Sequence, residues 1–186
     1  NSPALVVTDS QVFSQVSADV PESVPLTSFS ILSIRQKGDL AEMVKAVLAV
    51  ENLKPGDKVL IAESCSHHPL EDDIGRVKIP RWLNAHVGGG LKIETVPGCE
   101  YPDNLDEYKL VVHCGACTLN RKEMLRRQSI PAKAQIPMTN YGVLISYLHG
   151  VFPRALKPFP EIYRLFEKNG LIQRKKKVKS INSDIL

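Results

Sequence analysis

The chain has 186 residues, 43% of them hydrophobic, which is enough for one or two globular domains with a buried core. It contains no run of about 18 apolar residues and no signal-peptide pattern, so we expect a cytoplasmic protein that does not span a membrane. The net charge is +4, but five positive charges lie within residues 174–179, which leaves −1 for the rest. This segment has no aromatic residue on which a base could stack, so we expect a solvated tail and no nucleic-acid binding.

The first third of the chain alternates between strand and helix patterns. Strand patterns occur at residues 4–8 and 29–34, and helix patterns occur at residues 12–16 and 40–48. Asp9 and Ser10 are candidate caps of the first helix, and Asp39 is the candidate cap of the second. The turn Pro55-Gly56-Asp57 marks the expected boundary of a first domain, residues 1–57.

The rest of the chain, residues 58–186, is expected to form a second domain. Strands are predicted at 58–62, 91–96 and 110–112, helices at 72–87, 120–127, 143–148 and 160–168, and a looser segment at 131–140. Pro80 should interrupt the first of these helices, and the run Gly88-Gly89-Gly90 should end it. This alternation predicts an α/β protein of two small domains, each a mostly parallel sheet flanked by helices.

The most informative feature is a split cysteine–histidine motif. Cys65-Ser66-His67 is followed, after a gap of 45 residues, by His113-Cys114-Gly115-Ala116-Cys117. Each half comes directly after a predicted strand, and open α/β sheets bind ligands at the carboxyl ends of their strands. Three thiolates with imidazoles nearby form a ligand set for an iron–sulfur cluster or for zinc. The sequence therefore predicts a metal site that two separate strand ends assemble.

The strongest candidate ligands are the thiols of Cys65, Cys114 and Cys117. Three protein ligands leave a fourth position open, which is typical of a site that exchanges ligands and not of a closed structural site. His67 and His113 are candidates for this fourth position. The alternative for each histidine is a hydrogen bond that orients a thiolate. Cys99 has no cysteine near it in the sequence, and we interpret it as a thiol outside the site.

Motifs of several common enzyme classes are absent from the sequence. It contains no GxxxxGK[ST] phosphate-binding loop, no GxGxxG after a strand, and neither GxSxG nor HExxH. We therefore do not expect this chain by itself to be an enzyme. Four basic residues near the motif could attract an anionic ligand or could simply be exposed surface charges: Arg76, Lys78, Arg81 and Arg121.

Together with its surroundings, the motif resembles that of the HydF family, the maturation factors of [FeFe]-hydrogenase. The surroundings that carry the resemblance are residues 6–11, 25–30, 37–40, 73–83 and 139–142. The resemblance covers nearly the whole chain except the basic tail, residues 174–186. It implies a dimerisation domain in residues 1–57 and an iron–sulfur cluster-binding domain in residues 58–186. The family's N-terminal GTPase domain, and GTP binding with it, would be missing from this chain.

The resemblance also implies a function. Cys65, Cys114 and Cys117 would bind a [4Fe–4S] cluster with an exchangeable fourth ligand, and His67 and His113 would belong to the same metal site. HydF proteins receive a diiron precursor, which carries CO, cyanide and a dithiolate, from radical-SAM maturation enzymes and deliver it to apo-[FeFe]-hydrogenase. We therefore expect a scaffold or carrier that forms a homodimer or a higher oligomer. The alternatives are a structural zinc-binding module and an electron-transfer iron–sulfur module.

Overall fold

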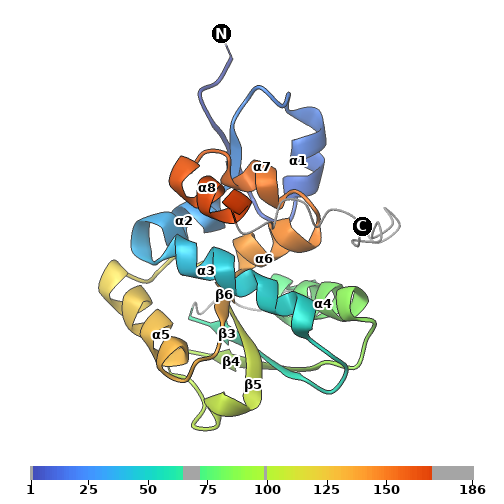
Figure 1. The fold of residues 1–186 in the computed structure, drawn as a ribbon, viewed down its shortest axis with the longest axis vertical. Helices are drawn as coiled ribbons and strands as arrows, with labels where there is room; N and C mark the ends of the chain where they lie inside the picture. Colours follow the sequence, from blue (N-terminus) through green and yellow to red (C-terminus); the bar gives the residue numbers. More distant parts are fainter. Residues whose placement is uncertain (1, 65–71, 99, 169–186) are drawn as a thin grey trace.

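Four parallel strands form the main sheet of the protein, in the order β4-β3-β5-β6 (Figure 1). The inner strands are β3 (Lys58–Glu63) and β5 (Tyr108–His113), and the edge strands are β4 (Lys92–Pro97) and β6 (Met138–Asn140). Each inner strand contains four buried residues in a row, because helices or loops cover both faces of an inner parallel strand. The computed structural model describes residues 2–64, 72–98 and 100–168.

A smaller sheet consists of β1 (Val6–Thr8) and β2 (Leu26–Ser28), which also pair in parallel. Helix α1 (Phe13–Asp19) connects these two strands, and α2 (Phe29–Lys37) follows β2 directly. The predicted fold class, α/β with two mostly parallel sheets flanked by helices, is confirmed. A sheet of two strands is marginally stable by itself, so this sheet depends on the elements packed around it.

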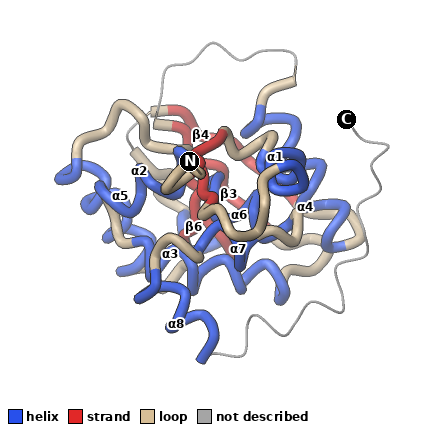
Figure 2. Tube along the Cα trace, turned by 90° about the horizontal axis from the view of Figure 1, so that it is seen from above, coloured by secondary structure: helices blue, strands red, loops and turns tan. Residues whose placement is uncertain are grey.

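Helix α6 lies at the centre of the molecule. The remaining helices are α3 (Leu40–Ala46), α4 (Ile79–Val87), α5 (Arg121–Lys133), α6 (Tyr141–Leu148), α7 (Phe152–Leu156) and α8 (Pro160–Lys168). Short 3₁₀-helical segments lie at Val47–Asn52 and Leu105–Glu107, and a π-helical turn lies at Ile74–Lys78. α6 contacts β5, β6, α2, α4 and α7, and it lies near the middle in two perpendicular views (Figures 1 and 2). Six of its eight residues are buried, which explains why its sequence is apolar on all sides.

Several local predictions are confirmed. The Asp39 carboxylate accepts a hydrogen bond of 3.1 Å from the Glu42 backbone N–H and caps α3. Pro80 lies in the first turn of α4, and the predicted helix 72–87 is accordingly divided into a π-helical turn and α4. Gly88 ends α4 in the left-handed conformation with φ of 96°, which glycine adopts without steric cost.

The predicted strand at residues 29–34 is wrong, because these residues form the first part of helix α2. The strand lies just before it, at Leu26–Ser28. The Ser28 hydroxyl accepts a hydrogen bond of 3.3 Å from the Ile31 N–H, which caps the helix. Ile31 and Ile34 face the core at helical spacing, whereas Phe29 is 65% exposed. Over a run this short, helix and strand periods cannot be distinguished in the sequence.

Other differences concern short elements. Neither Asp9 nor Ser10 caps α1, which begins after Val12; the Asp9 carboxylate instead accepts a hydrogen bond from the Gln11 N–H. Helix α5 continues through Pro131, and the segment predicted as loose contains strand β6. Helix α7 was not predicted. Strand β6 has three residues and α7 has five, which is too short for a periodic pattern to show in the sequence, so tertiary contacts determine them.

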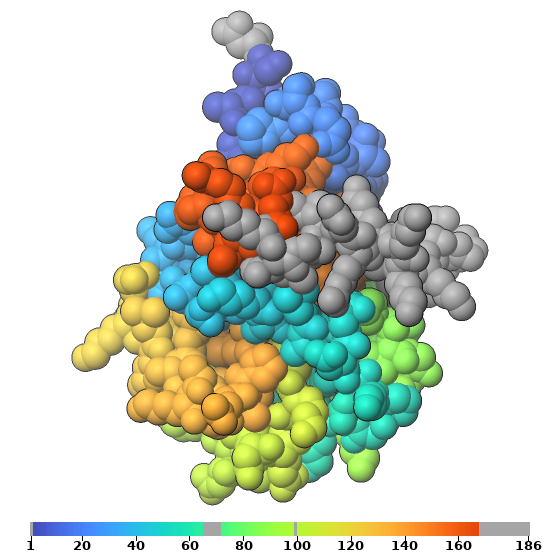
Figure 3. All heavy atoms as spheres, viewed as in Figure 1, coloured from blue at the N-terminus to red at the C-terminus, as the bar shows by residue number. Residues whose placement is uncertain are grey.

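The N-terminal elements pack on the C-terminal helices. Thr27 of β2 donates a hydrogen bond of 3.0 Å to the Ala155 carbonyl of α7. The buried Arg154 guanidinium donates to the backbone carbonyls of Ser17, Val20 and Pro21 in the connection between α1 and β2. Figure 3 shows the start of the chain and the α7–α8 residues side by side on one face. Within the described residues, the first segment of the chain therefore packs on the C-terminal helices.

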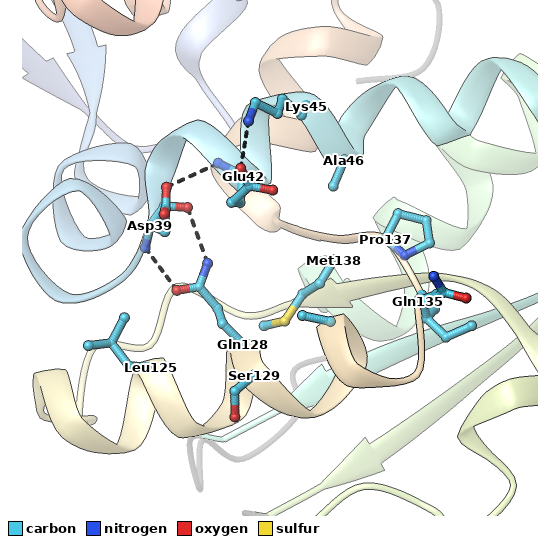
Figure 4. A pocket seen from close by; sticks show the side chains of 12 residues that line it. Asp39, Glu42, Lys45, Ala46, Leu125, Gln128, Ser129, Gln135, Pro137 and Met138 are labelled. Atoms are coloured by element: carbon cyan, nitrogen blue, oxygen red, sulfur yellow. Dashed lines mark hydrogen bonds and ion pairs between the residues drawn. The ribbon is translucent and has the colours of Figure 1, made fainter.

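Helix α5 is joined to the start of α3 across an open groove of about 610 Å³ (Figure 4). The Gln128 side chain accepts a hydrogen bond of 2.8 Å from the Asp39 N–H and donates one of 3.1 Å to the Asp39 carbonyl. On the other side of α3, Thr139 of β6 donates to the Met43 carbonyl. Residues 39–46 therefore pack with the four-stranded sheet, although the sequence grouped them with the first domain.

We predict that Arg154→Met lowers the free energy of unfolding by about 3 kcal/mol, because three backbone carbonyl groups lose a buried, charged donor. Urea unfolding followed by circular dichroism measures this loss. Arg35→Met is the matched control, because Arg35 pairs with Glu161 where both side chains are about half exposed. The control should change the free energy by less than about 1 kcal/mol. Equal effects of the two substitutions would contradict the assigned role of Arg154.

Candidate metal centre

The cysteine motif lies at the carboxyl edge of the main sheet. From β3 the chain passes to β4 on one side and later returns to β5 on the other, so the strand order reverses between β3 and β5. Such a reversal leaves a crevice at the carboxyl ends of the two strands, where α/β proteins bind their ligands. Cys114 directly follows β5, and its N–H donates a hydrogen bond of 3.0 Å to the Ala62 carbonyl of β3. Cys65 and His67 lie outside the described residues.

The Cys114 thiol is buried and lies against the end of β3. Its residue is 7% exposed. The Ser64 N–H donates to Cys114 Sγ over 3.3 Å, and the Ser64 hydroxyl lies 3.0 Å from the same sulfur. Hydrogen-bond donors at a sulfur stabilise its thiolate form, which is the form that binds metals. Ser64, which the sequence analysis did not select, therefore supports Cys114 as a ligand.

The loop from Cys114 to Cys117 makes a sharp turn, which hydrogen bonds from another part of the chain stabilise. Ala116 adopts the left-handed conformation with φ of 56°, which is uncommon for a residue with a side chain. The Lys37 ammonium group at the end of α2 donates hydrogen bonds of 3.0 and 2.9 Å to the Ala116 and Cys117 carbonyls. Cys114 and Cys117 are not joined by a disulfide, and Cys117 is exposed. The first segment of the chain thus stabilises the turn that presents both thiols.

His113 is completely buried, and both of its ring nitrogens make hydrogen bonds. The Arg127 Nε–H donates to His113 Nε2 over 2.7 Å. Because Nε2 accepts this bond, the proton of the neutral ring is on Nδ1, which donates to the Cys114 carbonyl over 2.8 Å. To bind a metal, the ring would have to give up one of these bonds. Ligation by His113 stays a prediction, whereas its contact with the backbone of Cys114 agrees with the alternative of an orienting role.

Arg127 is a site residue that the sequence analysis missed. It is completely buried on α5, donates a hydrogen bond of 3.2 Å to the Gly98 carbonyl, and lies 4.9 Å from the centre of the Tyr101 ring. Burial raises the pKa of Tyr101 to about 12, although the nearby arginine charge opposes this shift. The signal in the sequence was the spacing of Met124, Arg127 and Pro131, which places a charged residue on the buried face of the helix.

A cavity of about 700 Å³ opens beside the two described cysteines. Its walls come from five parts of the chain: Asp9–Gln11, the first turns of α2, Glu63 with Asp72–Lys78, the Cys114–Cys117 loop, and α6. Cys114 and Cys117 both line this cavity. The N-terminal segment therefore contributes a wall to the candidate metal centre.

Two basic residues at this cavity form ion pairs with carboxylates of the protein. Arg76 donates hydrogen bonds of 2.9 and 3.2 Å to the Glu63 carboxylate. Lys78 lies 3.0 Å from an Asp72 carboxylate oxygen and donates to the Gln11 side chain. Both basic residues are thus already paired within the cavity wall. This pairing makes their charge less available to an anionic ligand, one of the two alternatives that the sequence left open.

The described residues supply part of the predicted metal set. Two thiols face one cavity beside hydrogen-bond donors, which is suitable chemistry for an iron–sulfur cluster or zinc. Among residues 2–64, 72–98 and 100–168, no group of three His, Cys, Asp or Glu side chains is placed to hold a metal ion. The third predicted thiol belongs to Cys65, which is the next residue in the sequence after Ser64, and the Ser64 N–H donates to Cys114 Sγ.

Comparisons with known proteins identify two domains. Residues 1–38 match the family model of the Hydrogen maturase F dimerization domain, and residues 41–158 match that of the Hydrogen maturase F tetramerization domain. No curated protein matches the chain at a significant level. The two family models meet where α2 ends, whereas the boundary at residue 57 stays a prediction. None of the described helices is long and apolar enough to cross a membrane.

We predict that Arg127→Met lowers the free energy of unfolding by about 2–4 kcal/mol, because His113 and the Gly98 carbonyl both lose a buried charged donor. The neighbouring variant Arg126→Met is the control, since Arg126 pairs with Glu123 on the surface. It should cost less than about 1 kcal/mol. The measurement is urea unfolding followed by tyrosine and tryptophan fluorescence. If both variants unfolded at the same urea concentration as the wild type, the hydrogen bonds of Arg127 would not contribute to the stability of the fold.

Proposed function

This chain belongs to the hydrogen maturase F (HydF) family, whose function is hydrogenase maturation, and on this premise we propose that it is an iron–sulfur scaffold. In this proposal it carries a [4Fe–4S] cluster with an exchangeable fourth ligand and delivers a diiron precursor to apo-[FeFe]-hydrogenase. One observation carries the proposal: Cys114 and Cys117 line the same cavity at the carboxyl ends of β3 and β5, next to the residue that precedes Cys65.

Cys65, Cys114 and Cys117 would hold the cluster. When bound, the cluster would supply an iron with an open coordination position. Ser64 donates to the Cys114 sulfur and would stabilise the thiolate. Lys37 holds the carbonyl groups of the loop, so the two thiols keep their separation and direction while ligands exchange. These contacts leave the cavity side of the loop available to a cargo.

The hydrogen bonds of His113 argue against this residue as the fixed fourth ligand of a closed site. With three cysteines as ligands, a closed structural site or an electron-transfer centre needs a fixed fourth ligand. His113 is already bonded through both nitrogens, to Arg127 and to the Cys114 carbonyl. In this arrangement it orients the loop and leaves the fourth position to another group. Radical-SAM maturation enzymes as donors of the cargo, and the hydrogenase as its acceptor, belong to the same proposal.

We predict that Cys65→Ala, Cys114→Ala and Cys117→Ala each abolish cluster loading, because two remaining thiolates do not retain a cubane cluster. The wild-type chain, reconstituted without oxygen, should contain about four irons and four sulfides. Cys99→Ala is the matched control and should load like the wild type. Cluster content in all three variants equal to that of the wild type would refute the ligand assignment. Stoichiometric zinc without iron would favour the structural zinc module.

The same sample tests whether the fourth ligand is exchangeable. Its electron paramagnetic resonance spectrum, recorded after reduction, should shift when imidazole is added. An unchanged spectrum would indicate four fixed ligands and would favour the electron-transfer alternative.

The two family matches support assembly of this chain into an oligomer. We propose a homodimer in which a second copy extends the small sheet at β1. Within the described residues, β1 pairs only with β2, and its three residues are partly exposed. An unpaired strand edge is a template for pairing with another chain. This pairing would bring two cluster sites into one particle.

We predict that Val7→Pro removes the β1 interface and reduces the size of the oligomer. The Val6 N–H donates to the carbonyl of Pro25, the residue before β2, so the next N–H, that of Val7, points away from β2 to the open edge. Proline at an edge position removes this donor while the chain can still fold. Sedimentation velocity measures the change, and Val7→Ala, which keeps the N–H, is the control. An oligomer of unchanged size in Val7→Pro would place the dimer interface elsewhere.

A further inference from the structure

Three hydroxyl groups in the wall of the cysteine cavity have no hydrogen-bond partner among the described residues. They are Ser10 Oγ, Ser33 Oγ and Tyr141 OH, and each oxygen is buried. Ser10 as a whole is only 7% exposed. A buried hydroxyl without a partner costs free energy, so three of them in one cavity call for a ligand or ordered water. This grouping is independent of the cysteine motif, because the hydroxyls come from other elements.

Ser30 is a further hydroxyl residue in the wall of this cavity. Ser30, which precedes Ser33 by one helical turn, accepts hydrogen bonds of 3.1 Å from the Asn140 side chain and from the Gly142 N–H. Since its oxygen accepts both bonds, its O–H proton remains for donation. A Cβ on Gly115 would lie 3.6 Å from this oxygen and 3.5 Å from Cys117 Sγ, so Ser30 and Cys117 flank the same glycine.

The Tyr141 hydroxyl lies against Gly75 in the wall of the cavity. It reaches Gly75 so closely that a Cβ at this position would be 2.1 Å from its oxygen. Burial raises the pKa of Tyr141, and the nearby Glu63 carboxylate raises it further. The hydroxyl therefore keeps its proton at neutral pH and acts as a hydrogen-bond donor. Only a residue without a side chain at position 75 allows this placement.

The charged groups of the cavity are already engaged with one another. Glu63 is paired with Arg76, and Asp72 with Lys78. The carboxylates of Asp9 and Asp73 accept from the backbone N–H groups of Gln11 and Arg76, two or three residues further along the chain. The hydroxyls are thus the donors that the described protein atoms leave uncommitted. Neutral donors suit a ligand that presents hydrogen-bond acceptors on a compact body.

We propose that Ser10, Ser33 and Tyr141, assisted by Ser30, form a hydrogen-bond-donor subsite for the acceptor ends of the cargo. This inference rests on the proposed function, in which the cargo is the diiron precursor. Its acceptors are then the cyanide nitrogens, since metal-bound CO is a poor acceptor. Two of the three hydroxyls lie in residues 1–38, which match the dimerization domain. This domain therefore has a second role: it recognises the ligand.

The test uses a cyanide-bearing diiron carbonyl complex as the probe and the full chain, both with and without the reconstituted cluster. Ser10→Ala, Ser33→Ala and Tyr141→Phe each remove one hydroxyl and little else. We expect the dissociation constant of the probe to rise about 2- to 10-fold for each variant. The infrared C≡N stretching bands of the bound probe should shift, because each loses a donor at nitrogen, while the CO bands move less. Ser129→Ala is the control, because Ser129 lies in the groove of Figure 4 and donates to the Arg126 carbonyl.

The outcomes separate this inference from the scaffold proposal. Iron and sulfide content of the wild type reports on the cluster, whereas binding to the cluster-free chain reports on the hydroxyls alone. Weaker binding by the three variants in the cluster-free form would support the subsite even if no cluster could be loaded. Wild-type affinity and unshifted C≡N bands in all three variants would overturn it and would indicate that water satisfies the hydroxyls. Failure of the probe to bind either form of the wild type would overturn it as well.

Discussion

The pairing of β3 with β5 is the constraint on which the candidate site depends. These parallel strands are separated by 44 residues of sequence between Glu63 and Tyr108, yet they run side by side and end at the same edge of the sheet. The ladder continues beyond the strands, because the Cys114 N–H donates to the Ala62 carbonyl. This bond brings Cys114 against Ser64, the residue before Cys65. The strand reversal between β3 and β5 leaves a crevice at the ends of these two strands, each of which is followed by one half of the motif in the sequence.

Two helices that are distant in the sequence then hold the loop that carries Cys114 and Cys117. Lys37 binds its carbonyl groups from α2, and the buried Arg127 on α5 fixes the tautomer of His113, whose ring donates to the Cys114 carbonyl. This support explains how a residue with a side chain, Ala116, keeps the left-handed conformation. A rigid loop is an advantage for a scaffold, because thiols that stay in place lose less entropy on metal binding.

The N-terminal segment connects assembly with the site. Its small sheet is marginal alone and packs on α7, partly through Arg154. The same segment supplies Lys37 at the cysteine loop and Ser10 and Ser33 at the cavity. A second copy bound at β1 would therefore act on an element that also lines the ligand cavity. Oligomer formation and cargo binding can be coupled through this shared wall, since one rigid segment contributes to both.

Local sequence signals predicted the longer elements and the chemistry of the motif. The apolar runs of β3 and β5, the Asp39 cap and the glycine run after α4 follow from backbone sterics and side-chain periodicity, which act within a few residues. The motif and the segments around it resemble the HydF family, and the two family matches confirm this resemblance. By contrast, α2 was mistaken for a strand, because six apolar and small residues fit either period until the Ser28 cap and the core contacts of Ile34 decide.

What the sequence by itself determined is the set of groups able to bind a metal and their position after strands. Only the tertiary structure decided which groups surround them. Arg127 donates a hydrogen bond to His113, and Arg76 and Lys78 are paired with carboxylates. Hydroxyl residues from the segment before α1, from α2 and from α6 line the same cavity. The physical reason is that these contacts join residues from 6 to more than 100 positions apart in the chain, and only the folded chain brings them together. Periodicity and capping act locally, whereas burial and pairing of distant side chains exist only once the sheet has formed.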